Sequence, residues 1–264
     1  MDADTGLLDR FLQACRPVAR SAGAAILRVA DEGIDVETKE DGSPLTRADR
    51  ASHEIIVSAL ESLEPKLPIL SEEGDVASPQ MRRWRTYWCV DPLDGTKEFI
   101  KGLGEYTVNI ALIDRGAPVL GVVYLPVRQT EYYAARGCGA WKAAGDDEPQ
   151  PLRPSAAPRP RKAVVSRSHL SDETMRYLEA LGVAETISHG SSIKICAVAE
   201  GAADIYPRHG PTCLWDTAAG AAVAVEAGCD VVDLDGKPLT YDPADGIRKA
   251  GFMVYPKGID LAPV

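Results

Sequence analysis

The segment WCVDPLDGTKEFIKG, residues 88–102, ends an apolar run with two aspartates three positions apart, Asp91 and Asp94. Pro92 has no backbone N–H to give to a neighbouring strand, so we expect the strand to end here. Gly95 then lets the backbone turn sharply and pass close to a ligand. Two carboxylates in such a turn are typical either of a solvated loop or of a metal site, because carboxylates bind hard cations.

The residues after this turn add an anion-binding feature. Residues 97–101 are predicted to form a short helix that ends at Gly102. The N–H groups at the start of a helix are free and carry the positive end of its dipole, so residues 95–97 could bind an anion. Amides for phosphate beside carboxylates for cations indicate a metal-dependent phosphate site. The spacing excludes an EF-hand calcium loop.

Other acidic residues lie at the ends of predicted elements. Glu72 and Glu73 follow a short predicted strand and precede a glycine, and Asp216 lies in the first turn of a strongly apolar predicted helix. Taken singly, the first two are a common surface pair and Asp216 is an ordinary N-cap. Together they favour one site, because α/β folds place their ligands at the ends of elements.

The elements that must position these acids differ between the two halves of the chain. Helices are predicted at residues 5–30 and after the N-cap Thr46. A strand is predicted at YWCVDP, and the three strands after it, from YTVNIALI to TEYYAAR, are predicted to form an antiparallel meander. Residues 143–162 carry five prolines and indicate an irregular connector. Beyond it, strands and helices alternate. We therefore expect an N-terminal α+β half at residues 1–150 and a C-terminal α/β half at residues 151–264.

Composition excludes several classes of function. The 264 residues carry a net charge of −10, which argues against a nucleic-acid-binding surface and means that an anionic substrate would need local cations or metal. The six cysteines form no CxxC pair and are expected to be free thiols in a reducing compartment. The N-terminus lacks the pattern of a secretory signal, and no apolar run approaches the ~20 residues of a spanning helix. A cytoplasmic protein is expected, with peripheral inner-membrane association left open.

Several motifs together resemble one protein family. DPLDGT at 91–96, SEEG at 71–74 and WDTAAG at 215–220 are similar to the two signature segments and the acidic pair of the inositol monophosphatase superfamily. More narrowly, the chain resembles the bacterial 3′(2′),5′-bisphosphate nucleotidases of that superfamily in DGSPLTRAD, DPLDGTKEFI, GEYTVNIALI, GSSIK and IYPR. An inositol monophosphatase would be expected to carry DGTTNF in place of DGTKEF, and an apolar residue in place of Lys194. The resemblance implies a layered α-β-α-β-α sandwich, often as a homodimer, with the site between the halves.

The resemblance also implies a set of metal ligands. The first magnesium would be held by Glu72, Asp91 and the backbone carbonyl of Leu93. The second would be held by Asp91, Asp94 and Asp216, and a third, weaker ion would lie near Glu72 and water. Oxygen ligands of this kind are the ones that magnesium prefers.

The roles of the remaining site residues are implied in the same way. Thr96 would orient the attacking water, the amides of Gly95 and Thr96 would hold phosphate oxygens, and Asp49 would take the proton of the water. Glu72 is counted with the catalytic residues and Asp216 with the substrate contacts. Asp49 has a second interpretation, because T-x-x-D at 46–49 is also the pattern of a helix capping box.

The substrate contacts are assigned to the second half. By resemblance, the nucleotide and its second phosphate would meet His169, Ser191, Lys194 and Arg208. An extra phosphate on an acidic protein requires a cation, which Lys194 and Arg208 can supply. From the residues alone, a solvated position for Lys194 and a loop position for His169 stay open.

The function that follows is a magnesium-dependent phosphatase. It would remove the 3′-phosphate of adenosine 3′,5′-bisphosphate, giving AMP and phosphate, would clear this by-product of sulfate assimilation, and would be inhibited by lithium. The first alternative is the same chemistry on an inositol or sugar phosphate. The second is a non-catalytic sensor of metal and nucleotide, whose signature would be the loss of Thr96, Asp49 or a metal ligand; none is lost.

Overall fold

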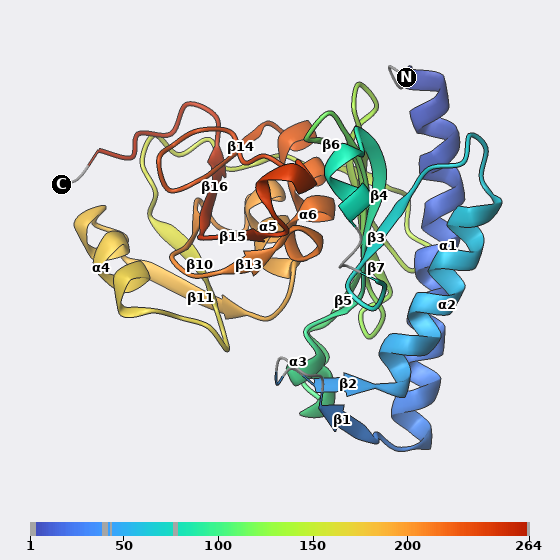
Figure 1. The fold of residues 1–264 in the computed structure, drawn as a ribbon. Coiled ribbons are helices and arrows are strands. Elements are labelled where there is room, and N and C mark those ends of the chain that lie inside the picture. Colours follow the sequence, from blue (N-terminus) through green and yellow to red (C-terminus); the bar gives the residue numbers. More distant parts are fainter. Residues whose placement is uncertain (1–3, 39–41, 43, 76–78, 263–264) are drawn as a thin grey trace.

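The computed structural model describes residues 4–38, 42, 44–75 and 79–262, which form stacked layers of helices and sheets (Figure 1). In chain order the elements are α1 (Thr5–Glu32), β1 (Val36–Thr38), β2 (Pro44–Thr46), α2 (Arg47–Ser62), β3 (Ile69–Ser71), η1 (Pro79–Arg83), β4 (Thr86–Asp94), α3 (Thr96–Ile100), β5 (Thr107–Asp114), β6 (Ala117–Leu125), β7 (Thr130–Ala135), β8 (Gly139–Ala144), β9 (Gln150–Pro151), β10 (Lys162–Ser166), α4 (Asp172–Ala180), β11 (Glu185–His189), α5 (Ile193–Ala199), β12 (Tyr206–Arg208), β13 (Thr212–Cys213), α6 (Leu214–Ala227), β14 (Cys229–Val232), η2 (Pro243–Asp245), β15 (Arg248–Lys249) and β16 (Phe252–Pro256).

A seven-stranded sheet with the order β3-β4-β5-β6-β7-β8-β9 forms the largest layer. The pair β3–β4 is parallel and the other pairs are antiparallel. Helices α1 and α2 cover one face of this sheet, and α5 and α6 separate its other face from the smaller sheets and α4 (Figure 1). The predicted layered α-β-α-β-α sandwich is therefore confirmed.

Helix α1 follows from a repeated apolar spacing. Its residues Leu8, Phe11, Cys15 and Ile26 recur at helical intervals and are all buried. The Asp4 side chain accepts a hydrogen bond from the Leu7 N–H and so caps the first turn. Phe11 meets Trp88 of β4 edge to face, with 5.2 Å between ring centroids. This contact joins the outer helix to the strand that carries the predicted metal ligands.

Helix α6 lies unusually close to the sheet because both surfaces are made of small residues. A Cβ atom on Gly121 of β6 would lie only 2.2 Å from the Ala219 carbonyl oxygen and 2.9 Å from the Ala222 Cβ. On the opposite side of the helix, a Cβ atom on Gly220 would lie 3.0 Å from Ile195 of α5. Glycine at both positions therefore fixes the depth at which α6 brings Asp216 to the sheet.

The C-terminal part contains three small sheets. Strands β10 and β11 are parallel, β12, β16 and β14 form an antiparallel sheet, and β13 pairs with β15. Leu178 and Leu181, in and just after α4, pack in one apolar cluster with Ala163 and Val165 of β10. This cluster joins α4, the outer helical layer on this side of the sandwich, to the sheet of β10 and β11 (Figure 1).

Two local expectations were wrong. Strand β4 does not end at Pro92 but continues to Asp94, with a register shift between Asp91 and Asp94. The missing N–H of Pro92 is tolerated because the ladder is interrupted at that point. Residues 143–162 are not wholly irregular either, since they include the end of β8 and all of β9, and both strands pair at the edge of the sheet. The division into residues 1–150 and 151–264 stays a prediction.

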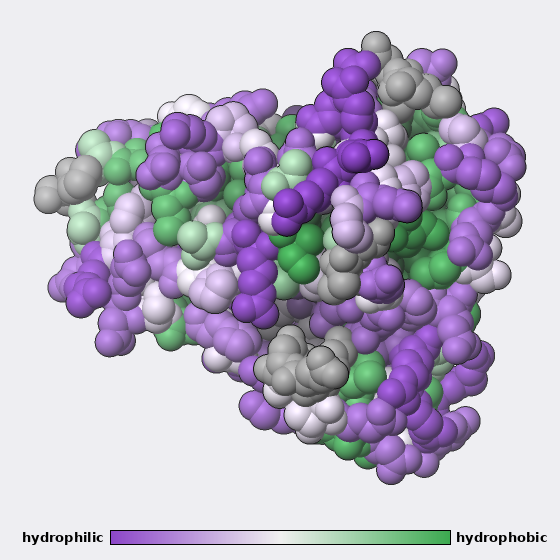
Figure 2. Space-filling view, in the orientation of Figure 1, coloured by the Kyte–Doolittle hydropathy of each residue, from purple (hydrophilic) through white to green (hydrophobic). Residues whose placement is uncertain are grey.

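Several bulk properties agree with the composition. The six cysteines, all of which lie in the described ranges, are free. Hydrophilic residues predominate on the face shown in Figure 2, with hydrophobic residues in separate patches between them. Within the described part of the chain, none of the helices combines the length and the apolar composition that crossing a bilayer requires.

Candidate active site

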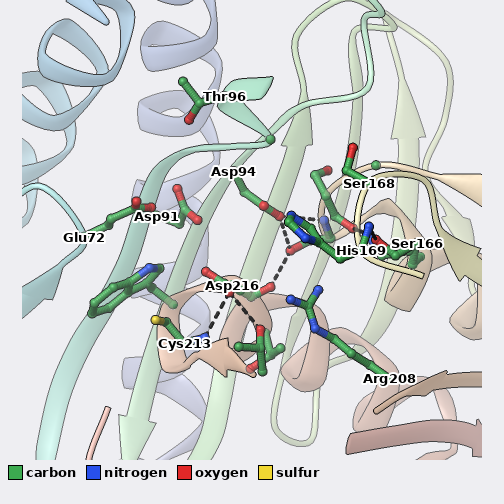
Figure 3. Close-up of a pocket in the computed structure, with 18 of the residues that line it drawn as sticks. Glu72, Asp91, Asp94, Thr96, Ser166, Ser168, His169, Arg208, Cys213 and Asp216 are labelled. Atoms are coloured by element: carbon green, nitrogen blue, oxygen red, sulfur yellow. Dashed lines mark hydrogen bonds between the residues drawn. The ribbon is translucent and has the colours of Figure 1, made fainter. Parts of the chain in front are cut away.

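Three carboxylates from three separate elements converge at one end of the large sheet. Glu72 follows β3, Asp91 lies in β4 and Asp216 lies in the first turn of α6. One ligand oxygen of each lies within 4.8 Å of the others. Asp91 is 1% exposed. Figure 3 shows these residues and Asp94 around one space, with His169 and Arg208 beside it. The fold thus brings together Glu72 and Asp216, which lie far apart in the sequence.

Asp216 is fixed by the first turn of α6, but it is not the N-cap that its position suggested. Its Oδ2 accepts hydrogen bonds from the Cys213 N–H at 2.9 Å and from the Thr212 hydroxyl at 2.7 Å. Cys213 is the N-cap of α6, so Asp216 is the third helical residue of a capping box rather than the cap itself. The helix start therefore fixes the carboxylate that also joins the acidic cluster.

Contacts to the backbone fix the predicted ligands at the end of β4 and the turn that follows it. The Leu93 N–H donates to Asp91 Oδ1 at 3.1 Å, and the Leu93 carbonyl accepts from the Thr96 hydroxyl at 3.3 Å. Gly95 adopts a φ of 94°. A Cβ atom there would lie 3.1 Å from the Glu105 carbonyl oxygen and 3.3 Å from the Ser191 Cβ. A side chain at this position would therefore be strained and crowded.

Asp94 is directed toward Ser192 and lies outside the group of three. Its Oδ2 accepts from the Ser192 N–H at 2.6 Å, from the Ser192 hydroxyl at 3.0 Å and from Asn109 Nδ2 at 3.4 Å. Burial and the nearby charge of Asp216 raise the pKa of Asp94 to about 6, although Lys194 and the hydrogen bonds from Ser192 oppose the rise. Ser192 thus anchors the carboxylate that the sequence assigns to the second metal.

Asp49 closes the capping box of α2 and also contacts Thr96, so the capping interpretation of T-x-x-D is confirmed and the catalytic one stays a prediction. Asp49 Oδ2 accepts from the Thr46 N–H at 2.7 Å and from the Thr46 hydroxyl at 2.6 Å, which closes the capping box of α2. Its other oxygen, Oδ1, accepts from the Thr96 hydroxyl at 3.3 Å. The capping role therefore fixes Asp49 beside Thr96, which follows Asp94 and Gly95 in the chain.

The electrostatics of the cluster favour a bound cation. Burial raises the pKa of Asp91 well above its ordinary value, and the charges of Glu72, Asp94, Asp216 and Asp49 raise it further. Like charges this close repel each other unless a proton or a cation lies between them. A donor set made of carboxylate oxygens, with a backbone carbonyl nearby, suits a hard divalent ion. The residues present therefore fit a metal site.

The predicted substrate residues line the same cavity, which has a volume of about 590 Å³. Gly95, Thr96, His169, Ser191, Lys194, Arg208 and Asp216 all contribute to its wall. The Ser191 carbonyl lies within reach of the buried Lys194, which donates to it at 2.5 Å. Lys194 also lies over the Tyr206 ring, 5.6 Å from the centroid. A solvated position for Lys194 is therefore excluded.

Arg208 and His169 complete the cationic side of the cavity. One terminal nitrogen of Arg208 donates to the Pro211 carbonyl at 2.8 Å, and its buried Nε meets no hydrogen-bond partner within the described residues. Burial lowers the pKa of His169, and the charges of Lys97 and Arg208 lower it further. His169 lies in a loop, as its context suggested, but it borders the cavity.

Two site residues escaped the sequence assignment although their motifs were recognised. Ser192 stands beside Ser191 in GSSIK, and Asn109 stands in GEYTVNIALI. Asn109 Nδ2 donates to the Ser192 hydroxyl at 2.9 Å, and the Ser192 hydroxyl also reaches the Asp216 carbonyl at 2.7 Å. The motifs were the available signal, but contacts between segments 83 residues apart are visible only in three dimensions.

The fold and the acidic site define a class of protein, and sequence comparison agrees with it. The profile of the inositol monophosphatase family matches residues 7–257, and this chain belongs to that family.

More specific relatives are bisphosphate nucleotidases. The 3′(2′),5′-bisphosphate nucleotidase CysQ of Salmonella typhimurium is 52% identical over 244 residues, which are 92% of this chain and 98% of the relative. The enzyme of the same name from Escherichia coli K12 is 51% identical over the same shares of both chains.

Solved structures of the same family superpose on this chain. CysQ from Bacteroides thetaiotaomicron, described as a bacterial member of the inositol monophosphatase family, superposes with a TM-score of 0.82 at 43% identity. The match covers 94% of this chain and 97% of that one. An inositol monophosphatase from Thermotoga maritima superposes with a TM-score of 0.77 at 25% identity, over 95% and 93% of the two chains.

Proposed function

We propose that this protein is a metal-dependent 3′(2′),5′-bisphosphate nucleotidase that converts adenosine 3′,5′-bisphosphate to AMP and phosphate. The observation that carries the proposal is that one cavity joins a carboxylate cluster to the cations Lys194 and Arg208. The carboxylate cluster can hold the metal that hydrolysis of a phosphate monoester would use. The two cations can bind a second phosphate, which an acidic protein would otherwise repel. The names of the relatives that are 51–52% identical support the same substrate class.

We assign the metal to magnesium, held in two sites. Glu72, Asp91 and the Leu93 carbonyl would form the first, and Asp91, Asp94 and Asp216 would form the second, with a weaker third near Glu72. When bound, such ions polarise the phosphoryl group, lower the pKa of water and stabilise the leaving oxygen. The protein contributes the convergence of these ligands from β3, β4 and α6.

Thr96 and Asp49 would handle the attacking water. The Thr96 hydroxyl lies 3.3 Å from both Asp49 Oδ1 and the Leu93 carbonyl, and its single proton can go to either of them. The Thr96 oxygen can then accept a hydrogen bond from water. The water can thereby be oriented, and its proton can pass toward the Asp49 carboxylate. The N–H groups of Gly95 and Thr96, at the turn that begins α3, would hold the oxygens of the phosphate.

The opposite side of the cavity would hold the nucleotide. The Lys194 ammonium and the Arg208 guanidinium would meet the second phosphate through charge-assisted hydrogen bonds. Ser191 and His169 would contact the nucleoside, and Asp216 would lie between nucleotide and metal. We also propose lithium inhibition and a role in clearing this by-product of sulfate assimilation, as the resemblance implies; a homodimer stays a prediction.

A substrate panel tests the proposal. Phosphate release would be measured with adenosine 3′,5′-bisphosphate and with inositol 1-phosphate, each with magnesium, without magnesium and with lithium added. The expected result is magnesium-dependent turnover of the nucleotide only, abolished by lithium. Preference for the inositol phosphate would keep the metal site and overturn the roles of Lys194 and Arg208. Binding of metal and nucleotide without turnover would favour a sensor.

A further inference from the structure

Glu105 lies outside the cavity lining, in the loop between α3 and β5, yet its carboxylate joins two other segments. Oε1 accepts from Arg167 at 2.9 Å and from His189 Nδ1 at 3.1 Å. Oε2 accepts from Arg167 Nε at 2.8 Å and from the Gly190 N–H at 3.0 Å. Each oxygen therefore receives two donors. Arg167 follows β10 and His189 ends β11, so one side chain ties down the ends of both strands.

The backbone of Glu105 is packed between two glycine turns. A Cβ atom on Gly95 would lie 3.1 Å from the Glu105 carbonyl oxygen, and one on Gly190 would lie 2.7 Å from the same atom. The residue thus contacts both the turn after Asp94 and the turn before Ser192. This packing leaves little room for the two turns to move relative to each other.

The second of these turns reaches the predicted metal site directly. Ser191 has a φ of 44°, a left-handed conformation that a serine keeps only when its neighbours hold it. Ser192 follows and donates to Asp94 from its N–H at 2.6 Å. Its hydroxyl lies 3.0 Å from the same carboxylate and 2.7 Å from the Asp216 carbonyl, so its single proton can go to either. The path from Glu105 to Asp94 therefore runs through Gly190, Ser191 and Ser192.

We propose that Glu105 is a positioning residue for the reaction, which fixes the turn at residues 189–192 so that Ser192 keeps the Asp94 carboxylate oriented toward the metal. This inference rests on the proposed function, because it takes Asp94 as a metal ligand. Arg167 contributes to the same positioning, since it supplies two of the four hydrogen bonds that the Glu105 carboxylate accepts. The positions of Ser191 and Ser192 would then depend on the Glu105 carboxylate, which lies outside the cavity lining.

The charge state of Glu105 suits this role. Burial alone would raise its pKa, but the hydrogen bonds from Arg167, His189 and the Gly190 N–H outweigh burial and lower the pKa to about 2. The carboxylate therefore stays ionised throughout the range in which the enzyme would work, and all four contacts persist.

The test uses Glu105→Gln. A glutamine keeps the shape, but its amide nitrogen is a donor that would face two further donors. We expect calorimetric titration with magnesium alone to show about 3- to 10-fold weaker binding, below the ~10- to 100-fold effect typical of partners that contact a ligand directly. The magnesium concentration for half-maximal nucleotide hydrolysis should rise by the same factor. The KM for the nucleotide at saturating magnesium should change less.

The chain offers a matched control. Glu131 on β7 is also buried, and its carboxylate is paired with Arg16 and Arg20 outside the cavity lining. Glu131→Gln should lower the unfolding temperature and leave magnesium binding unchanged. If Glu105→Gln does not fold, Arg167→Gln takes its place, because the Arg167 side chain is 41% exposed and removing it costs little packing.

The outcomes separate this inference from the proposed function. Unchanged magnesium binding in Glu105→Gln or its replacement would overturn the inference, and so would an equal loss in the Glu131→Gln control. Neither of these two results would affect the proposed function, because in both cases the wild-type enzyme still hydrolyses the nucleotide with magnesium. A wild-type protein without that activity would instead overturn the proposed function.

Discussion

Among the individual residues, the site combines carboxylates that can hold a cation with basic side chains that can bind an anion. Glu72, Asp91 and Asp216 gather negative charge within 4.8 Å, which only a cation or protons can offset. Across the same cavity, Lys194 and Arg208 offer positive charge to an anion. The arrangement favours a substrate that carries one phosphate for hydrolysis and a second for recognition.

Asp94→Asn tests the metal side of the site. The asparagine keeps the size and can still accept from Ser192, so the variant should fold. A neutral amide binds a hard cation poorly, and magnesium-dependent turnover should fall by more than about 100-fold, beyond the ~10- to 100-fold effect of residues that only support a ligand. Steady-state kinetics at several magnesium concentrations would measure this, and full activity would refute the two-metal assignment.

Lys194→Met tests the recognition of the second phosphate. Losing a charge-assisted hydrogen bond of about 1.5–3 kcal/mol should lower kcat/KM for adenosine 3′,5′-bisphosphate by roughly 10- to 100-fold. For adenosine 3′-phosphate, which lacks the second phosphate, the loss should be much smaller. Lys142→Met is the control, because Lys142 is paired with Glu200 at 2.6 Å and lies over the Tyr132 ring, outside the cavity lining. An equal loss for both substrates would count against the assignment.

At the scale of elements, the site depends on how closely α6 approaches the sheet. Gly121→Ala would place a methyl group 2.2 Å from the Ala219 carbonyl oxygen, so α6 or β6 would have to shift. We expect a loss of about 1–3 kcal/mol in the free energy of unfolding. Because the shift would move Asp216, catalytic activity should fall as well.

Gly6→Ala in α1 is the matched control for this change. A methyl group there meets only Asp4 Oδ1 at 3.6 Å, and alanine is a better helix former than glycine. Urea unfolding should show equal or slightly higher stability for Gly6→Ala and lower stability for Gly121→Ala. Equal stability of the two variants would contradict the close-packing account.

The elements also show how far the sequence alone could lead. Thr46 as the N-cap of α2, the apolar spacing of α1 and the meander from β5 to β7 depend on local patterns, and they were predicted correctly. The continuation of β4 through Pro92 was not predicted, because its register shift depends on β5. Strand β9 contains a proline and only two residues, so its sequence has no strand signal.

The sequence predicted which acidic residues form the site, but it did not predict the residues that hold them in place. Asp91, Asp216 and Glu72 stand in short recognisable motifs, and the structure brings them together. Glu105 and Arg167 form contacts between residues 62 positions apart, which follow from tertiary packing and not from any local pattern. Supporting residues of this kind need a structure, whereas the ligand motifs do not.

For the molecule as a whole, the protonation of Asp94 in the site affects the stability of the folded state. The pKa of Asp94 is raised to about 6, above the value of about 4 expected when the chain is unfolded. Its contribution therefore favours the folded state at low pH and is lost as the pH rises through about 6. A cation that replaces the proton would restore this stability.

Magnesium should consequently stabilise the protein in a pH-dependent way. Below about pH 6 protons compete with the cation for Asp94, so the rise in unfolding temperature on adding magnesium should be larger at about pH 7.5 than at about pH 5. Thermal unfolding with and without magnesium at both pH values measures this. The same rise at both values would contradict the coupling, and Asp94→Asn should reduce the difference between them.

The most direct test of the central claim is the identity of the products. The protein would be incubated with adenosine 3′,5′-bisphosphate and magnesium, and the nucleotides would be separated by chromatography. The account predicts adenosine 5′-phosphate and one equivalent of phosphate, because Lys194 and Arg208 retain the 5′-phosphate while the carboxylate cluster acts on the 3′-phosphate. Adenosine 3′-phosphate as the product, or no turnover with magnesium present, would contradict it.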